Sequence, residues 1–333
     1  FGLSSNMNDN NVTSTSGSTT ARQDTDSLST SFSTQLIGHE VESSLSGLET
    51  ATTNLDLSES NENDRVACIL SKVKETASET RKLLLEQAMT TIVEAHLTTT
   101  INTHANVLEA NKKIQQKIQE MPEAYALSLN SNNLWQQFMS AMLPEITKVI
   151  EFCTKLPGFP ELRQADKIVL IKQGCFEVMV TRFCLLVDPD KEEMLDPTLQ
   201  IKAPRHVVRD TPMGDFLDQF FTVASQFNPL ALTDEEIGLF TAVLMTYPDR
   251  EGLMNRTTIS VIHQLFLQAL YLLLRKNHQD ADEILRSLIN IMPVVRKISE
   301  NHLEFLQKIK LNSPSEFDKK FPTLHRELFD IAC

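Results

Sequence analysis

The charged side chains most informative about chemistry lie around one short stretch and in the last helical pattern. Lys155 and Lys172 bracket the segment EFCTKLPGFPELRQADKIVLIK, and the pattern at 321–330 carries a carboxylate, Glu327. The two ends of a helix carry opposite partial charges on their uncapped backbone groups. A groove with cations at one end and a carboxylate at the other can therefore hold a partner's helix. This arrangement predicts a docking surface rather than a catalytic centre.

Sequence motifs of catalytic and metal-binding chemistry are absent. The chain contains no Gly-rich phosphate loop, no HExxH and no GxSxG. Its eight histidines are scattered without metal-ligand spacing. Cys175 and Cys184 fall in a segment that is apolar nearly all round, where thiols are usually inert packing groups. We therefore expect a protein that is not an enzyme.

Composition narrows the class further. Lys and Arg total 31 against 44 Asp and Glu, giving a net charge of −13 without a basic stripe, which argues against nucleic-acid binding by this segment. Five cysteines, an odd number with no CxxC pair, are typical of a reduced intracellular protein. The sequence has no uninterrupted apolar run of the roughly 18 to 20 residues that cross a bilayer, so no membrane association is expected.

The organisation changes near residue 64. Of the first 60 residues, 24 are Ser or Thr, which predicts a disordered segment at 1–63 rather than a β module, because strand-like alternation is missing. A helical domain of about 265 residues should follow, at 64–333. We expect helices near 66–83, 86–120, 132–156, 164–187, 212–227, 233–247, 257–277, 280–291, 294–310 and 321–331. The run 188–212 carries four prolines and predicts a loop with at most a small hairpin.

Three segments carry the fold prediction. The helix at 132–156 has a continuous apolar stripe, interrupted by Pro144, where a kink or break is expected. The helix at 164–187 is apolar nearly all round and should form the central layer. We expect its charged residues, Glu177 and Arg182, each to pair with a partner, because an unpaired buried charge is costly. Thr233 and Glu236 form a capping box that starts another helix. These patterns predict an all-α, layered domain.

Together these segments resemble the ligand-binding domain of nuclear receptors. The stretch EFCTKLPGFPELRQADKIVLIKQG resembles the signature between that family's third and fifth helices, LTDEEIGLFTAVLM its eighth, and FPTLHRELF its activation helix. The resemblance covers about 87–331 and is strongest to the retinoid-related orphan receptors and their invertebrate counterparts, since Rev-Erb receptors lack the activation helix. It implies a three-layer antiparallel helical sandwich, a lipophilic ligand pocket and a nuclear location. It also implies coactivators that bind through LxxLL helices, a hinge at 1–63, and DNA contact only through an upstream zinc-binding domain outside this chain.

The resemblance assigns a coactivator groove. Lys172 and Glu327 match the two charges of the family's clamp, Ile168 would line the groove floor, and Leu324 and Leu328 flank the glutamate. The third-helix lysine position holds Thr154, with Lys155 one place later, and one residue turns a side chain by about 100° round a helix. Whether Lys155 replaces the missing lysine stays open. The alternative is that both lysines are solvated surface cations.

The resemblance also implies a latch for the activation helix, formed by His302, His325 and Phe329. His325 stands where relatives have a tyrosine, so a neutral His–His hydrogen bond is possible, whereas protonation of both rings would repel. We therefore expect the active state to weaken as the pH falls towards 6. The alternative is that His325 faces solvent.

Ligand identity is less well defined. The side chains at positions that line the pocket in relatives are Trp135, Phe138, Met142, Phe176, Met179, Arg182 and Phe183. Leu185 replaces an arginine that helps to anchor a sterol hydroxyl in some relatives, so the ligand is a sterol-like or another lipophilic molecule. Alternatively, these side chains fill the pocket themselves and form core.

Two other functions and the oligomeric state remain open. A haem-binding sensor would need axial ligands such as His302 and Cys153, although no spacing selects them. A ligand-independent helical scaffold would need a closed pocket. The helix at 257–277 has one apolar face that could form a dimer contact or core, so monomer and dimer are both possible; this face carries Ile262, Leu265, Phe266, Ala269 and Leu273.

Overall fold

The computed structural model describes residues 62–74, 79–129, 131–197, 200–211, 214–312, 321 and 323–329, with the backbone alone at 62–65, 80 and 131–141. The predicted disordered segment at 1–63 lies almost wholly outside these residues. In chain order the helices are α2 (Glu62–Val73), α3 (Glu79–Thr99), α4 (His104–Glu120), α5 (Pro122–Ser128), α6 (Ser131–Lys155), α7 (Gln164–Phe183), α8 (Arg205–Arg209), α9 (Gly214–Phe227), α10 (Asp234–Met245), α11 (Arg256–Asn277), α12 (Ala281–Asn312) and α14 (Thr323–Leu328).

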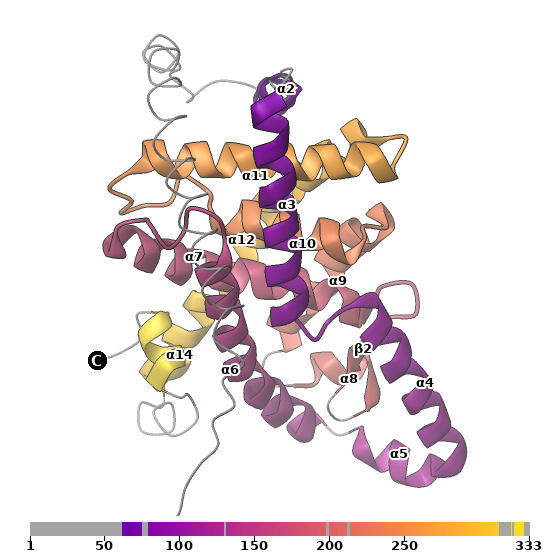
Figure 1. The fold of residues 1–333 in the computed structure, drawn as a ribbon. Coiled ribbons are helices and arrows are strands. Elements are labelled where there is room, and N and C mark those ends of the chain that lie inside the picture. The colour runs from indigo at the N-terminus through magenta and orange to yellow at the C-terminus, as the bar shows by residue number, and fades with distance from the viewer. Residues whose placement is uncertain are drawn as a thin grey trace, which may run out of the picture.

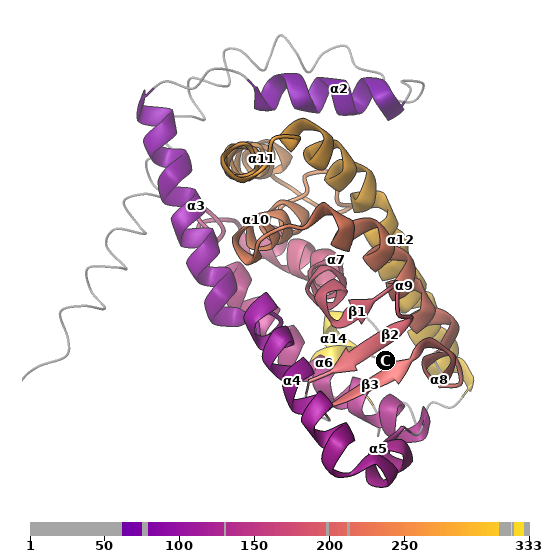
Figure 2. The ribbon, with the colours of Figure 1, turned by 90° about the vertical axis from the view of Figure 1, so that its right-hand side faces the viewer.

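The helices pack in three layers, as Figure 2 shows from the side. Helices α7 and α10 lie in the middle, α3 and α6 pack on one side, and α9 and α12 pack on the other. Every residue of α7 from Gly174 to Arg182 is buried, because the helix is apolar all round and has neighbours on both sides. The expected all-α, three-layer sandwich with this helix at its centre is confirmed.

The two charges predicted to pair within the central helix do so. Arg250 donates two hydrogen bonds to the Glu177 carboxylate, at 3.0 and 2.7 Å, and Arg296 lies 3.5 Å from it. Arg182 donates to the backbone carbonyl and the hydroxyl of Thr99, at 3.0 and 3.1 Å. Removal of one partner would leave a buried charge uncompensated, so these pairs hold the layers in one arrangement.

Several helix boundaries differ from the prediction. Helix α6 continues through Pro144, and α12 continues through Pro293, so the two helices expected at 280–291 and 294–310 are one. Burial of flanking side chains such as Met292 and Val295 offsets the backbone bond that proline removes. The single helix expected at 86–120 ends at Thr99 and restarts at His104, where the Thr103 hydroxyl caps the new helix by accepting from the Asn106 amide.

The run predicted as a loop contains a small antiparallel sheet. Strands β1 (Val187–Asp188), β2 (Glu193–Asp196) and β3 (Ile201–Pro204) pair in the order β1-β2-β3. Three of the four prolines, Pro189, Pro197 and Pro204, follow or end a strand and so do not prevent strand pairing, and Pro212 lies outside the described residues. The side chains of Leu195, Ile201 and Ala203 are buried, so the sheet closes one end of the domain.

Helix α11 belongs to the core. It is long and apolar enough to cross a membrane by length and composition, but most of that span is buried in the domain. The face considered for dimerisation is buried within the chain at Ile262, Leu265, Phe266 and Ala269. The structure therefore favours the core interpretation of this face over the dimer contact.

Candidate functional site

The last described helix is fixed to the domain by one face and leaves the other in solvent. His325, Leu328 and Phe329 are buried, together with Phe321 just before the helix, whereas Leu324 is 38% exposed and Glu327 is exposed. Steps of three and four residues place the buried side chains on one face of α14, which packs beside α6 (Figure 1). The arrangement presents a leucine and a carboxylate outward.

The seat of α14 is a cluster of aromatic rings. The ring of His302 on α12 stacks on Phe176 at 3.9 Å between centroids, and Phe329 meets it edge to face at 4.8 Å. His325 meets the same imidazole at 5.8 Å and 85°, also edge to face. The structure therefore brings the three predicted latch residues together and adds Phe176, which had been expected in the ligand pocket.

His302 and His325 do not form the His–His hydrogen bond that the sequence made possible. No described residue hydrogen-bonds either nitrogen of His302 or Nδ1 of His325, and Nε2 of His325 lies 3.1 Å from the Met142 sulfur. The two imidazoles thus meet through their rings without a His–His hydrogen bond. His325 is only 1% exposed, so the alternative that it faces solvent is wrong.

Burial keeps both imidazoles neutral. It lowers the pKa of His325 to about 4 and the pKa of His302 well below its usual value, the latter with a contribution from neighbouring His325. Desolvation disfavours the charged form of each ring, and no described carboxylate contacts the rings to offset this cost. The docked position of α14 therefore depends on neutral histidines.

Two of the predicted groove residues lie on α7. Ile168 is 44% exposed, so its side chain is accessible to a partner. Lys172, also on α7, lines an open pocket together with Leu328 and Phe329. A cation thus lies beside the end of α14, and an exposed isoleucine lies one turn before it on α7.

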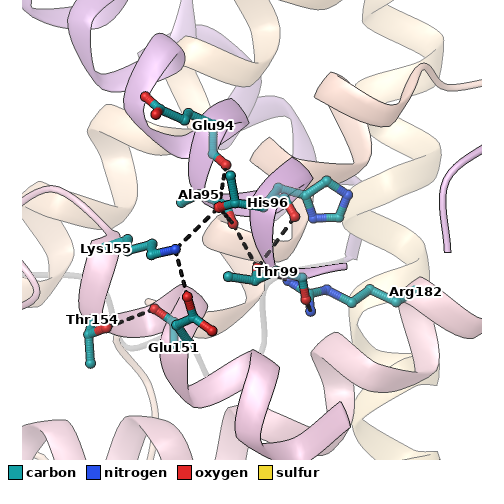
Figure 3. A network of polar contacts seen from close by, with 9 residues as sticks. Glu94, Ala95, His96, Thr99, Glu151, Thr154, Lys155 and Arg182 are labelled. Atoms are coloured by element: carbon teal, nitrogen blue, oxygen red, sulfur yellow. Dashed lines mark hydrogen bonds and ion pairs between the residues drawn. The ribbon is translucent and has the colours of Figure 1, made fainter. Parts of the chain in front are cut away.

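Lys155 is directed towards α3, as Figure 3 shows. Its ammonium group lies 2.7 Å from a carboxylate oxygen of Glu151 and 3.2 Å from the Thr98 hydroxyl. The Thr154 hydroxyl donates to the backbone carbonyl of Glu151 at 2.8 Å. The Lys155 pair is solvent-exposed, and such pairs contribute only about 0 to 1 kcal/mol, so a partner's carbonyl groups can compete for this lysine.

A separate cavity of about 120 Å³ lies beneath the sheet. Its described lining comes from the end of α7, the sheet, α8, α9 and the α3–α4 connection, and consists of Ile101, Asn102, Glu145, Phe183, Leu186, Val187, Met194, Leu195, Asp196, Pro197, Ala203, Val208, Thr211, Leu217 and Phe220. Among the predicted pocket residues, Phe183 belongs to this lining. The sheet contribution was missed because 188–212 was predicted as a loop with at most a small hairpin, and the helix expected at 212–227 was not assigned to the pocket.

The other predicted pocket residues lie elsewhere. Met142, Phe176, Met179 and Arg182 are fully buried packing groups outside the described lining of this cavity. Trp135 and Phe138 lie on the part of α6 whose side chains are outside the described residues. For the four buried residues, the structure favours the core alternative stated above.

Arg182 is engaged by the protein itself. Besides its bonds to Thr99, its guanidinium lies 3.6 Å from Glu145 and 5.1 Å from the centre of the Phe152 ring. Figure 3 shows the Arg182 side chain extending towards Thr99. Arg182, predicted as a pocket residue, is therefore bound to the last turn of α3.

The residues considered for haem are separated from the cavity. Neither Cys153 nor His302 is among its described lining residues. Burial raises the pKa of the Cys153 thiol to about 12, which disfavours the thiolate that binds metals. Within the described residues, no cluster of three His, Cys, Asp or Glu side chains is placed to hold a metal ion.

Comparison with known proteins identifies the fold. The family model "Ligand-binding domain of nuclear hormone receptor" matches residues 128–312, more than half of the chain. The chain is 32% identical to nuclear receptor ROR-beta of Homo sapiens over 203 residues, covering 60% of this chain and 42% of that protein. It is 32% identical to nuclear receptor subfamily 1 group D member 2 of Rattus norvegicus over 183 residues, covering 55% of this chain and 32% of that protein.

A third relative matches a longer stretch at lower identity. The probable nuclear hormone receptor HR3 of Drosophila melanogaster is 28% identical over 235 residues, covering 68% of this chain and 48% of that protein. The chain thus matches between about a third and a half of the length of these relatives. The family is non-enzymatic, in agreement with the absence of catalytic motifs. This chain belongs to the nuclear hormone receptor family and carries its ligand-binding domain.

Proposed function

We propose that this domain docks coactivator helices of the LxxLL type in a groove bounded by α6, α7 and α14, as part of a nuclear transcription regulator. The observation that carries the proposal is the two-sided character of α14. Its buried face is fixed by aromatic packing, while Leu324 and Glu327 remain available to a partner. A short amphipathic helix with an exposed carboxylate beside exposed apolar side chains can complete a binding groove.

The charges support a helical partner. Glu327 would accept hydrogen bonds from the uncapped amides at the partner helix's N-terminus, and Lys172 would meet its terminal carbonyls. Lys155 would join Lys172 after leaving its exposed pair with Glu151. Ile168 and Leu324 would contact the partner's leucines. Each element of an LxxLL helix thus has a complementary group.

The position of α14 supports activity without a ligand, with a lipophilic molecule acting as a modulator. None of its described residues lines the cavity beneath the sheet; the helix rests on protein side chains. A ligand in that cavity would act through α7 and α9, which reach both regions. The proposed function is therefore a constitutive coactivator platform that a ligand adjusts.

The decisive experiment measures the affinity of a fluorescent LxxLL peptide for the full chain by anisotropy. We expect Glu327→Gln and Lys172→Gln each to weaken binding by about tenfold or more, because charge-assisted hydrogen bonds contribute roughly 1.5 to 3 kcal/mol. Glu120→Gln and Lys113→Gln, on exposed positions of α4, serve as matched controls and should leave affinity unchanged. Equal effects at groove and control positions would refute the docking surface.

A further inference from the structure

Helix α2 closes a second pocket, separate from the cavity beneath the sheet. The helix lies across α11 and α12 (Figure 2), outside the residues that match the family model. Its Val66, Leu70 and Val73 are buried there. A helix of 12 residues is only marginally stable alone in water, so α2 is helical because it is docked. Between Val66 and Ile69 of α2, Leu267 of α11 and the middle of α12 lies a space of about 200 Å³, the α2 pocket.

Arg296 of α12 is the one charged residue among the described lining of the α2 pocket. Its guanidinium carbon lies 4.2 Å from the centre of the Tyr247 ring, which lines the same pocket. His263, another lining residue, adds no charge at neutral pH, because burial lowers its pKa to about 4. The described lining therefore presents a single positive charge among mainly apolar side chains.

The charge of Arg296 is only partly offset by the protein. Its Nε lies 3.5 Å from the Glu177 carboxylate, which already accepts two shorter hydrogen bonds from Arg250, so two guanidinium groups share one carboxylate. No described residue accepts a hydrogen bond from Nη1 or Nη2 of Arg296. Arg296 also borders the open pocket beside α14, and acids such as Asp249 and Glu300 line that pocket but not the α2 pocket. An anion in the α2 pocket would therefore meet donors without opposing carboxylates.

The size and walls of the α2 pocket define the rest of the ligand. A dry cavity of roughly 150 Å³ accommodates benzene, whereas drug-sized ligands fill about 300 Å³ or more. A volume of about 200 Å³ therefore suits one ring with a short chain. The walls from Leu267, Met292 and Pro293 are apolar and favour a hydrocarbon body. A guanidinium group matches a carboxylate, because its donors lie in a planar fork that can bond both oxygens.

We propose that the α2 pocket binds a small carboxylic acid with an apolar body of about one ring, whose carboxylate pairs with Arg296, and that the bound acid holds α2 against α11 and α12. The site goes beyond the proposed function, since it shares no described lining residue with the cavity beneath the sheet. Because α2 supplies one wall, the site depends on a segment outside the residues that match the family model.

The first test compares three probes of nearly equal shape on the unaltered full chain: phenylacetate, phenylethanol and phenylethylamine. Dissociation constants are measured by ligand-observed NMR at pH 7, where the acid is ionised and the amine protonated. We expect the acid to bind about tenfold more tightly than the alcohol, the range of a charge-assisted hydrogen bond, and the amine to bind most weakly. The net charge of −13 acts in the opposite direction, so a preference for the acid reports a local cation. Equal affinity for the three probes, or tighter binding of the amine, would overturn the proposal.

A variant of the arginine identifies the cation. Arg296→Gln removes the charge while Glu177 keeps its two bonds to Arg250, so the fold should persist and the preference for the acid over the alcohol should disappear. Arg286→Gln, at an exposed position of the same helix, is the matched control and should keep the preference. A preference that survives in Arg296→Gln would contradict the assignment.

A variant of α2 then locates the probe. Ile69→Glu places a carboxylate in the wall of the pocket, which repels the acid and competes for Arg296, so acid affinity should fall about tenfold. Ala67→Glu, at an exposed position of the same helix, adds the same charge outside the pocket and should leave acid affinity unchanged. Equal effects of the two changes would place the probe elsewhere, such as the open pocket beside α14, and refute the site.

Hydrogen exchange of the unaltered chain tests the coupling to α2 and decides the matter if a variant fails to fold by circular dichroism. Amides of a docked helix exchange when it undocks, and a ligand at ten times its dissociation constant lowers that undocked population by about tenfold. Amides at 66–73 should therefore exchange about tenfold more slowly with phenylacetate. Amides of α4, none of whose described residues line the pocket, should not change. Unchanged exchange in α2 under saturating acid would overturn the proposal.

Discussion

The seat of α14 and the cavity beneath the sheet differ in how completely side chains fill them. In the seat, aromatic rings from α7, α12 and α14 fill the space, and the histidine nitrogens are left largely without hydrogen bonds. In the cavity, space remains, and the buried carboxylate of Glu145 pairs with Arg182 at 3.6 Å. Side-chain packing holds the first region together, whereas the second leaves room for a further molecule. The molecule thus separates the helix that docks a partner from the space that receives a ligand.

The two regions are joined through α7. Phe176 stacks on His302 in the seat and contacts Phe216 of α9, the helix that also supplies Leu217 and Phe220 to the cavity wall. Tightly packed interiors transmit a displacement of one side chain to its neighbours. A molecule that moves α9 by filling the cavity would therefore act on the seat through this ring stack.

The largest expected effect comes from breaking the buried ion pair beside the cavity. Arg182→Met would leave Glu145 without its cation and the Thr99 carbonyl without its donor. We expect a loss of about 3 to 5 kcal/mol in the free energy of unfolding, measured by urea denaturation. Lys113→Met, which removes an exposed lysine paired with Glu109, should change it by less than about 1 kcal/mol. A small effect at Arg182 would mean that its contacts with Glu145 and Thr99 do not hold α6 and α3 to α7.

A smaller effect, confined to the seat, is expected from Phe329→Ala. This change removes a buried ring that contacts both His302 and His325. Truncating a buried phenylalanine costs about 3 kcal/mol or more, so α14 should detach and LxxLL-peptide affinity should fall about a hundredfold. The unfolding transition of the rest of the domain should move little. Leu311→Ala, at a side chain that is 82% exposed, is the matched control and should change neither quantity.

Filling the cavity should stabilise the domain modestly, whereas adding atoms to the seat should not. Ala203→Val adds two methyl groups to a strand residue that lines it. Each buried methylene-sized group contributes about 0.8 kcal/mol when it fits without strain, so we expect an increase near 1 kcal/mol in the free energy of unfolding. A larger side chain in the filled part of the seat, Met142→Phe against His325, should destabilise instead, since overpacking forces neighbouring rings apart. Equal effects at both places would mean that the seat and cavity are packed alike.

Features that depend on neighbouring residues in the chain could be predicted from the sequence, whereas features that join distant segments could not. Periodicity placed α7 at the centre, and the capping box of Thr233 and Glu236 forms with both expected hydrogen bonds, at 2.8 and 3.3 Å. The resemblance predicted that the latch histidines, His302 and His325, lie in one cluster. Glu145 escaped notice because it interrupts an apolar stripe beside a proline, and its burial depends on Arg182 on another helix. The cavity was missed for a related reason, since its wall is a sheet between proline-marked turns.

The smallest expected effect is the pH dependence of the docking of α14. With α14 docked, burial lowers the pKa of His325 to about 4, whereas a released, solvated ring would have the usual value near 6.5. The released state therefore binds more protons, so docking is fully favoured above pH 6.5 and is lost progressively as the pH falls towards 4. Linkage gives about 0.8 kcal/mol between pH 7.5 and 6, a roughly fourfold loss of LxxLL-peptide affinity.

The substitution His325→Phe isolates this contribution. It keeps an aromatic ring against His302, Phe321 and Phe329 while removing the titrating group. Peptide affinity of this variant should depend less on pH between 7.5 and 6 than the affinity of the unaltered chain does. A flat profile in the unaltered chain between pH 8 and 6 would disprove the pH-sensitive latch. If the peptide affinity of the variant depends on pH as strongly as that of the unaltered chain, another group must titrate. His302, the buried partner ring, would then be the next residue to replace.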